Sequence, residues 1–130
     1  MDDLYDGWIN PLGLYLCAKL REIAQAHVDH RPFSISPYDW KKSLAGPALT
    51  ILPVDLLIIE GVGSGQSAIR EFVETKIWID LEPIVGLRRV LVRDGFEIEE
   101  PMLAFLEEQQ IHFTKEGTRD AADFYLNGLR

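Results

Sequence analysis

The fold is constrained most by a short apolar run that ends in an acid and a glycine. This run covers residues 54–61, with the sequence Val-Asp-Leu-Leu-Ile-Ile-Glu-Gly. A short continuous apolar stretch bounded by turn residues is typical of a buried strand in a parallel sheet. The sequence therefore predicts a buried parallel strand over residues 55–60, which carries the carboxylate of Glu60 to a ligand site.

The strand resembles the Walker-B type, which holds Mg²⁺ against nucleotide phosphates and accompanies a P-loop of pattern G-x-x-x-x-G-K-[ST]. That pattern occurs nowhere in the 130 residues. The nearest segment, residues 60–67, has Glu60 in place of the first glycine and Gln66 in place of the lysine. A carboxylate there would repel a polyphosphate by about 1 kcal/mol or more. The metal-binding strand is therefore favoured, with a degenerate phosphate loop and a plain glycine-rich turn as alternatives.

Composition limits the classes of protein to which the chain can belong. With 130 residues and 47% hydrophobic content, the chain suffices for one domain with one core. The formal charge of −8 argues against nonspecific binding of nucleic acid and against docking on an anionic membrane. The single cysteine, Cys17, rules out a disulfide framework, and no secretion signal or apolar span is evident. A cytoplasmic location is therefore expected.

The pattern along the chain alternates between strands and helices. Apolar spacing, prolines and glycines predict helices over about residues 12–27, 67–75, 83–93 and 101–117. Strands are predicted at 55–60, 77–81 and 123–128, whereas the prolines of residues 31–53 favour irregular structure with two short edge strands. Strands separated by helices imply the α/β class, with a parallel sheet that helices cover on both faces.

Five short motifs follow one another in a specific order, at residues 1–5 (Met-Asp-Asp-Leu-Tyr), 38–40 (Tyr-Asp-Trp), 55–61, 88–94 and 118–123. Together they resemble the P-loop kinase superfamily and, within it, the uridine-kinase-like proteins most closely.

The resemblance implies a P-loop NTPase-type parallel sheet flanked by helices, which lacks the family's first strand, its P-loop and its first helix. Residues 1–130 would form one incomplete kinase-like domain. Within it, residues 5–53 would be the acceptor-binding insertion and residues 83–117 the lid-type helices. We expect the chain to be a member that is truncated at its N-terminus or begins at a wrongly assigned start, and to be nearly inactive alone.

The resemblance also assigns catalytic roles. Asp2 would be the general base that orients the acceptor hydroxyl, because phosphoryl transfer needs a carboxylate within hydrogen-bond reach of the nucleophile. Glu60 would help to hold Mg²⁺. The lid residues Arg88, Arg89 and Arg93 would stabilise charge on the transferred phosphoryl group, and Arg89 and Arg93 lie four positions apart on one helical face. The alternatives are a solvated acid at position 2 and a solvated basic helix face.

Aromatic residues would bind the acceptor. Tyr5 would lie against a planar ring, and Tyr38, Asp39 and Trp40 would supply aromatic faces beside an acid. Each aromatic could instead be a structural anchor. Trp40 and the following Lys-Lys-Ser stand where uridine kinases proper carry phenylalanine and a base-contacting histidine, so uridine specificity is not implied. Arg119 would lie near the adenine of the cofactor.

Two functions remain open. The first is an ATP-dependent, nucleoside-type kinase domain that transfers the γ-phosphate to a hydroxyl of a small acceptor, with ATP and Mg²⁺ as cofactors. The second is a non-catalytic protein that binds a metabolite or a partner. The acceptor and the oligomeric state are not specified by the sequence, and a homo-oligomer is one possibility because a missing strand would expose an apolar sheet edge.

Overall fold

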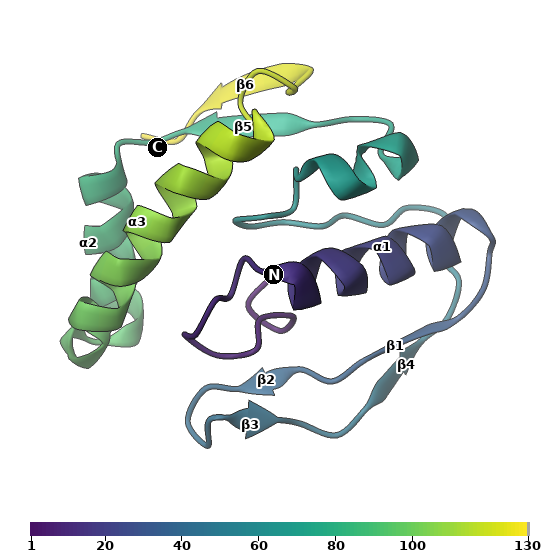
Figure 1. Cartoon of the computed structure of the whole chain (residues 1–130), viewed down its shortest axis with the longest axis horizontal. Helices are drawn as coiled ribbons and strands as arrows, with labels where there is room; N and C mark the ends of the chain where they lie inside the picture. The colour runs from purple at the N-terminus through teal and green to yellow at the C-terminus, as the bar shows by residue number, and fades with distance from the viewer. Residues whose placement is uncertain (130) are drawn as a thin grey trace. The chain divides into compact units, whose positions relative to one another are not determined.

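The structure, a computed structural model, describes residues 1–129 and divides into two compact units, Met1–Glu74 and Thr75–Arg130. The sequence predicts a single domain. Each unit has its own elements and its own buried residues, and the two are described in turn (Figure 1).

The first unit contains one α-helix, one 3₁₀-helix and two small antiparallel pairs. Its elements are α1 (Leu14–Val28), β1 (Phe33–Ile35), β2 (Tyr38–Asp39), β3 (Leu44–Ala45), β4 (Leu49–Ile51) and η1 (Ser67–Phe72). Strand β1 pairs with β4, and β2 pairs with β3 (Figure 1). The helix over 12–27 and the two short edge strands were predicted, whereas the β2–β3 pair was not. The helix expected over 67–75 is a shorter 3₁₀-helix.

Helix α1 supplies the core of this unit. Leu16, Leu20 and Ile23 recur at helical spacing and are almost fully buried. Ile23 packs with Ala26 and with Phe33 of β1. Partly buried apolar side chains from four other segments complete this cluster: Leu4, Ile35, Ile51, Leu57 and Ile59. One helical face thus gathers the N-terminal segment, the β1–β4 pair and the 57–59 segment.

The predicted buried strand over residues 55–60 is wrong. Residues 52–60 belong to no strand. Leu57 and Ile59 pack against the core cluster, but Leu56 is 74% exposed and Ile58 is 76% exposed. The physical reason is that an apolar run shows only that its side chains favour burial. Whether the run forms a strand depends on backbone hydrogen bonds with a second segment, which lies elsewhere in the chain. Here only one face of the segment meets a core.

The second unit is a β-α-α-β arrangement. Its elements are β5 (Ile77–Asp80), α2 (Pro83–Asp94), η2 (Phe96–Ile98), α3 (Glu99–Glu116) and β6 (Phe124–Asn127). Strands β5 and β6 are parallel, and Ile77 lies opposite Phe124 (Figure 1). Parallel neighbours need a long crossover connection, which α2 and α3 provide. The predicted strands 77–81 and 123–128 and both predicted helices are thus close to those observed.

Local signals set the ends of these helices. Pro83 occupies the first turn of α2, where its missing N–H costs nothing. Gly117 follows α3 in the left-handed conformation with φ 57°, which glycine adopts without steric cost. Leu87 and Leu91 are buried on one side of α2, and the ring of Trp78 packs edge-on against Phe113 of α3 at 4.8 Å.

The expected α/β class is confirmed in coarse form only. The chain mixes helices with small two-stranded sheets, and one of these sheets is parallel. Across residues 1–129 no extended parallel sheet of the P-loop type forms, which corrects the expectation of such a sheet. In the same part of the chain, no helix has both the length and the apolar character needed to cross a membrane.

Candidate functional site

The first five residues are held on two sides by backbone groups. On one side, the terminal amino group of Met1 donates to the carbonyl oxygen of Glu60 at 2.9 Å. The hydroxyl of Tyr5 donates to the carbonyl oxygen of Val62 at 2.8 Å. Leu4 packs against the core cluster of the unit. The segment is therefore fixed against the 60–62 loop, 57 to 59 positions away in sequence.

On the other side, the segment meets strand β2. The backbone N–H of Tyr38 donates to the carbonyl oxygen of Asp3 at 3.2 Å. The indole Nε1–H of Trp40 donates to the carbonyl oxygen of Asp2, also at 3.2 Å. Both bonds use backbone carbonyls of the segment, so the carboxylates of Asp2 and Asp3 stay available, and both residues are exposed.

Three aromatic rings gather around that of Trp40, and the four together form what we call the aromatic cluster: Tyr5, Trp8, Tyr38 and Trp40. Trp40 meets Tyr38 edge-on at 4.9 Å and Tyr5 edge-on at 6.5 Å. Trp8 lies 4.8 Å from Trp40 with a tilt of 58°. Three of the rings belong to the predicted acceptor site. Trp8 is not among the predicted site residues, because its contact with the distant Trp40 has no local signal in the sequence.

Two carboxylates act on the hydroxyl of Tyr5. Burial raises the pKa of this hydroxyl far above its ordinary value, and the charges of Asp2 and Glu60 raise the pKa further. The geometry agrees, because Met1, next to Asp2 in sequence, bonds to the carbonyl oxygen of Glu60, and Tyr5 bonds to that of Val62. The predicted base and the predicted metal ligand thus share one neighbourhood.

The carboxylate of Asp39 binds only to neighbouring residues in the sequence among the contacts that the structure shows. Its carboxylate accepts hydrogen bonds from the backbone N–H groups of Lys41 and Lys42, and it pairs with the Lys42 ammonium at 2.9 Å. The side-chain bond from Lys42 is the main cause that lowers the pKa of Asp39. An aspartate that bonds to backbone two and three residues ahead stabilises a turn. Asp39 therefore organises the β2–β3 connection, and its predicted role in binding substrate stays a prediction.

The glycine-rich loop is packed against side chains of its own unit. Gly61 has φ 123°, and an added Cβ there would lie 2.8 Å from the Cβ of Met1. Gly63 has φ 89°, and its added Cβ would lie 3.0 Å from a methyl group of Leu16. Buried Gln66 donates from Nε2 to the Gly63 carbonyl at 3.0 Å. These contacts favour the glycine-rich turn over a phosphate loop, because apolar side chains cover the glycines.

The residues present were also considered as metal ligands. No group of three or more His, Cys, Asp or Glu side chains within residues 1–129 could hold a metal ion. Glu60 nevertheless has Asp2 as an acidic neighbour around Tyr5. Mg²⁺ is commonly bound by only one or two carboxylates together with substrate phosphates. The predicted role of Glu60 therefore stays a prediction.

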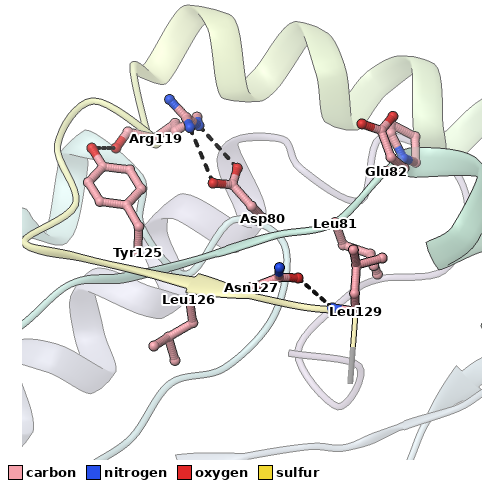
Figure 2. Close-up of a pocket in the computed structure, with 9 residues that line it drawn as sticks. Asp80, Leu81, Glu82, Arg119, Tyr125, Leu126, Asn127 and Leu129 are labelled. Carbon is pink, nitrogen blue, oxygen red and sulfur yellow. Dashed lines mark hydrogen bonds and ion pairs between the residues drawn. The ribbon is translucent and has the colours of Figure 1, made fainter.

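In the second unit, a pocket of about 450 Å³ lies where β5 and β6 end (Figure 2). Arg119 pairs with Asp80 through two contacts of 3.2 Å, and its guanidinium lies over the ring of Tyr125 at 5.2 Å from the centroid. The Tyr125 hydroxyl donates to the Arg119 carbonyl at 2.9 Å. The hydrogen bond from Arg119 is the main cause that lowers the pKa of Asp80. Ligands of parallel sheets bind outside the carboxyl ends of the strands, where this pocket lies.

The three lid arginines have different surroundings. Arg89 donates to the carbonyl oxygen of Gly128 at 2.7 Å. Arg93 forms a two-point pair with Asp94, its neighbour in sequence, at 2.7 and 2.6 Å. Arg88 and Arg89 line a second pocket of about 370 Å³ on α2. Arg89 and Arg93 share a helical face but bind different partners in this structure.

The structure thus brings five of the predicted site residues together in the first unit: Asp2, Tyr5, Tyr38, Trp40 and Glu60. The second unit holds the three lid arginines and Arg119. Comparison with known proteins adds no relative, since no protein-family model and no curated protein matches the chain.

Proposed function

We propose that the chain is the acceptor-binding part of a nucleoside-type kinase, which transfers a phosphoryl group to a hydroxyl of a small ring-bearing molecule. One observation carries the proposal. Asp2, Tyr5, Tyr38, Trp40 and Glu60 were selected from sequence as acceptor, base and metal residues, and they come from three segments that meet in the first unit. Trp40 contacts the rings of Tyr5 and Tyr38 and bonds to the backbone of Asp2, and the residue before Asp2 bonds to the carbonyl oxygen of Glu60.

Asp2 is the proposed proton acceptor. The Tyr5 hydroxyl keeps its proton at neutral pH, because its pKa is raised and it donates to the Val62 carbonyl. It therefore cannot take a proton from an acceptor hydroxyl. The Asp2 side chain is exposed, and only its backbone carbonyl is used by Trp40. Its carboxylate is free of that structural contact and can orient and deprotonate a hydroxyl in the transition state.

The aromatic cluster is proposed to hold the ring of the acceptor. Trp40 is fixed by its hydrogen bond to Asp2 and by edge contact with Tyr38. A planar ring that stacks on these side chains would lie next to the backbone that carries Asp2. Binding of the ring would then place an attached hydroxyl near the base, and this positioning is a large part of catalysis in phosphoryl transfer.

The residues present suit the implied cofactor Mg²⁺ better than they suit the phosphates of ATP. Exposed Glu60 suits Mg²⁺ as a single carboxylate that needs phosphate oxygens to complete the shell, which leaves Asp2 to act as the base. Bound Mg²⁺-ATP would supply the phosphoryl group and neutralise its charge. The 60–67 loop does not fit phosphates, because Met1 and Leu16 cover its glycines. In the second unit, Arg119 is paired with Asp80 and its guanidinium lies over the Tyr125 ring, so its predicted position near the adenine stays a prediction.

A second candidate function follows from the same loop. Because side chains of the first unit fill the space at Gly61 and Gly63, the chain can be a protein that binds the acceptor without transferring phosphate to it. It would then use the aromatic cluster alone.

Binding and transfer are measured separately to test both candidates. The intact chain is titrated with uridine and with adenosine by calorimetry, with and without Trp40→Ala. It is then incubated with Mg²⁺-ATP and each nucleoside, and monophosphate is detected by mass spectrometry. Binding that Trp40→Ala removes, together with product that Asp2→Asn abolishes, supports the kinase. Since the chain is expected to be nearly inactive alone, binding without product is compatible with both candidates, whereas absence of binding overturns both.

A further inference from the structure

We propose that Trp8 is a further acceptor-binding residue, which stacks on the planar ring of a nucleoside-like molecule together with Trp40. This inference rests on the proposed function, because it concerns the same acceptor site. Trp8 belongs to none of the motifs that the sequence analysis singled out. Its assignment comes from its position and exposure in the first unit.

Gly7 is the residue that brings Trp8 to the cluster. It is buried and has φ 81°, a left-handed conformation that costs a residue with a side chain. A Cβ at this position would lie 2.8 Å from the Tyr38 hydroxyl oxygen. The backbone therefore turns directly against Tyr38, and the next residue is Trp8, whose ring lies 4.8 Å from Trp40. This turn depends on glycine because its backbone is left-handed and because a side chain at this position would collide with Tyr38.

The geometry of the two indoles decides how a third ring can contact them. Their planes are tilted by 58° with 4.8 Å between the ring centroids, so a ring that stacks face-to-face on Trp8 meets Trp40 at an angle. Trp40 is fixed by its bond to the Asp2 carbonyl, whereas Trp8 is 38% exposed. The exposed part of Trp8 next to Trp40 is therefore available to a ligand.

The chemistry of the site indicates the class of ligand. Indole rings stack on any flat heteroaromatic ring, because every such ring has a π-face. The carbonyl of Asp2 fixes the Trp40 indole on the segment that also carries the proposed base. A molecule that joins a planar ring to a hydroxylated sugar would use both features. A sugar without a ring would have nothing to stack on Trp8.

The test uses adenosine and uridine as probes and ribose as the ringless control. Binding to the intact chain is measured for wild type, Trp8→Ala and Trp8→Phe. The matched control is Ile9→Ala, which removes a neighbouring apolar side chain that is 91% exposed. Trp8→Ala should weaken nucleoside binding about tenfold or more, since one stacked base contributes that much in other proteins. Trp8→Phe should recover part of the loss, and Ile9→Ala should change nothing.

A second measurement uses the wild-type protein, so it does not depend on a substitution within the cluster. The chain has three tryptophans, and their indole N–H resonances can be followed by NMR in the wild-type protein. Adenosine should shift the resonances of Trp8 and Trp40, and uridine should do the same without shifting that of Trp78, in the second unit. Ribose should shift neither Trp8 nor Trp40.

The outcomes separate this inference from the proposed function. If Trp40→Ala weakens binding while Trp8→Ala behaves like Ile9→Ala, the acceptor site stands and the role of Trp8 is overturned. The same conclusion follows if adenosine shifts only Trp40. If neither nucleoside binds the wild-type chain, both the role of Trp8 and the acceptor site are overturned.

Discussion

The indole Nε1–H of Trp40 donates a hydrogen bond to the backbone carbonyl of Asp2, 38 positions earlier in the chain, at 3.2 Å. The bond uses the main chain of Asp2 and leaves the side chain exposed. The residue proposed to bind the acceptor ring thus fixes the segment that bears the proposed base. Structure and chemistry at position 2 can therefore be separated by mutation.

Asp2→Asn should keep the fold and lose catalysis. The carbonyl that Trp40 binds is unchanged, so we expect the melting temperature to stay within about 2 °C of wild type, as is usual for a surface substitution. An amide cannot accept the proton, so whatever rate of nucleoside monophosphate formation the chain supports should fall about 10²–10⁴-fold. Asp3→Asn is the matched control, because Asp3 is also bonded through its backbone carbonyl, which accepts a hydrogen bond from the backbone N–H of Tyr38. A loss of rate in Asp3→Asn instead would move the role of base to Asp3.

Gly7→Ala should destabilise the first unit more than Gly117→Ala destabilises the second. Both glycines have positive φ, which costs a non-glycine residue about 1–2 kcal/mol. A Cβ at Gly117 would have no neighbour within 4 Å, whereas at Gly7 it would lie 2.8 Å from the Tyr38 hydroxyl. Gly7→Ala therefore adds a steric cost to the conformational one. Urea unfolding of the two variants measures the difference, and equal losses would show that Tyr38 moves away freely.

Leu57→Ala and Leu56→Ala should differ although the residues are adjacent. Leu57 packs against Ile23, Ala26 and Phe33, so we expect its truncation to cost about 1–3 kcal/mol, less than for a fully buried leucine. Leu56 is 74% exposed and should change the free energy of unfolding by less than about 0.5 kcal/mol. Chemical unfolding checks both values. Equal, large losses would mean that residues 55–60 are covered on both faces, as in the strand predicted from sequence.

The stability of the second unit should depend on pH through His112. Its side chain is buried, its Nε2 atom has no hydrogen-bond partner, and burial is the main cause that lowers its pKa. The folded unit therefore favours neutral histidine. The contribution to stability is complete above the unfolded pKa of about 6.5 and is lost as the pH falls from there through the folded pKa.

His112→Gln should flatten this dependence, as measured by urea unfolding between about pH 5 and pH 8, while exposed His30→Gln serves as the control. The reporter is the indole resonance of Trp78, which packs on Phe113 beside His112. A profile that stays the same in His112→Gln would show that another group titrates.

The sequence by itself determined the elements whose signals are local. The periodicity of residues 12–27 predicts α1, and Pro83 and Gly117 mark ends of α2 and α3 near where the structure has them. The apolar runs of β5 and β6 were found for the same reason. Each of these signals is contained within a few turns of helix or one strand, so no distant residue is needed to interpret it.

Only the tertiary structure decided which segments pair and which side chains meet. The run 55–60 has the composition of a buried strand, but no strand pairs with it in residues 1–129, and half of its apolar side chains stay exposed. The contact of Trp8 with Trp40 and the position of Met1 against Glu60 likewise carry no local signal. Local patterns encode periodicity and polarity, whereas pairing depends on hydrogen-bond partners and packing surfaces that lie far away in the chain.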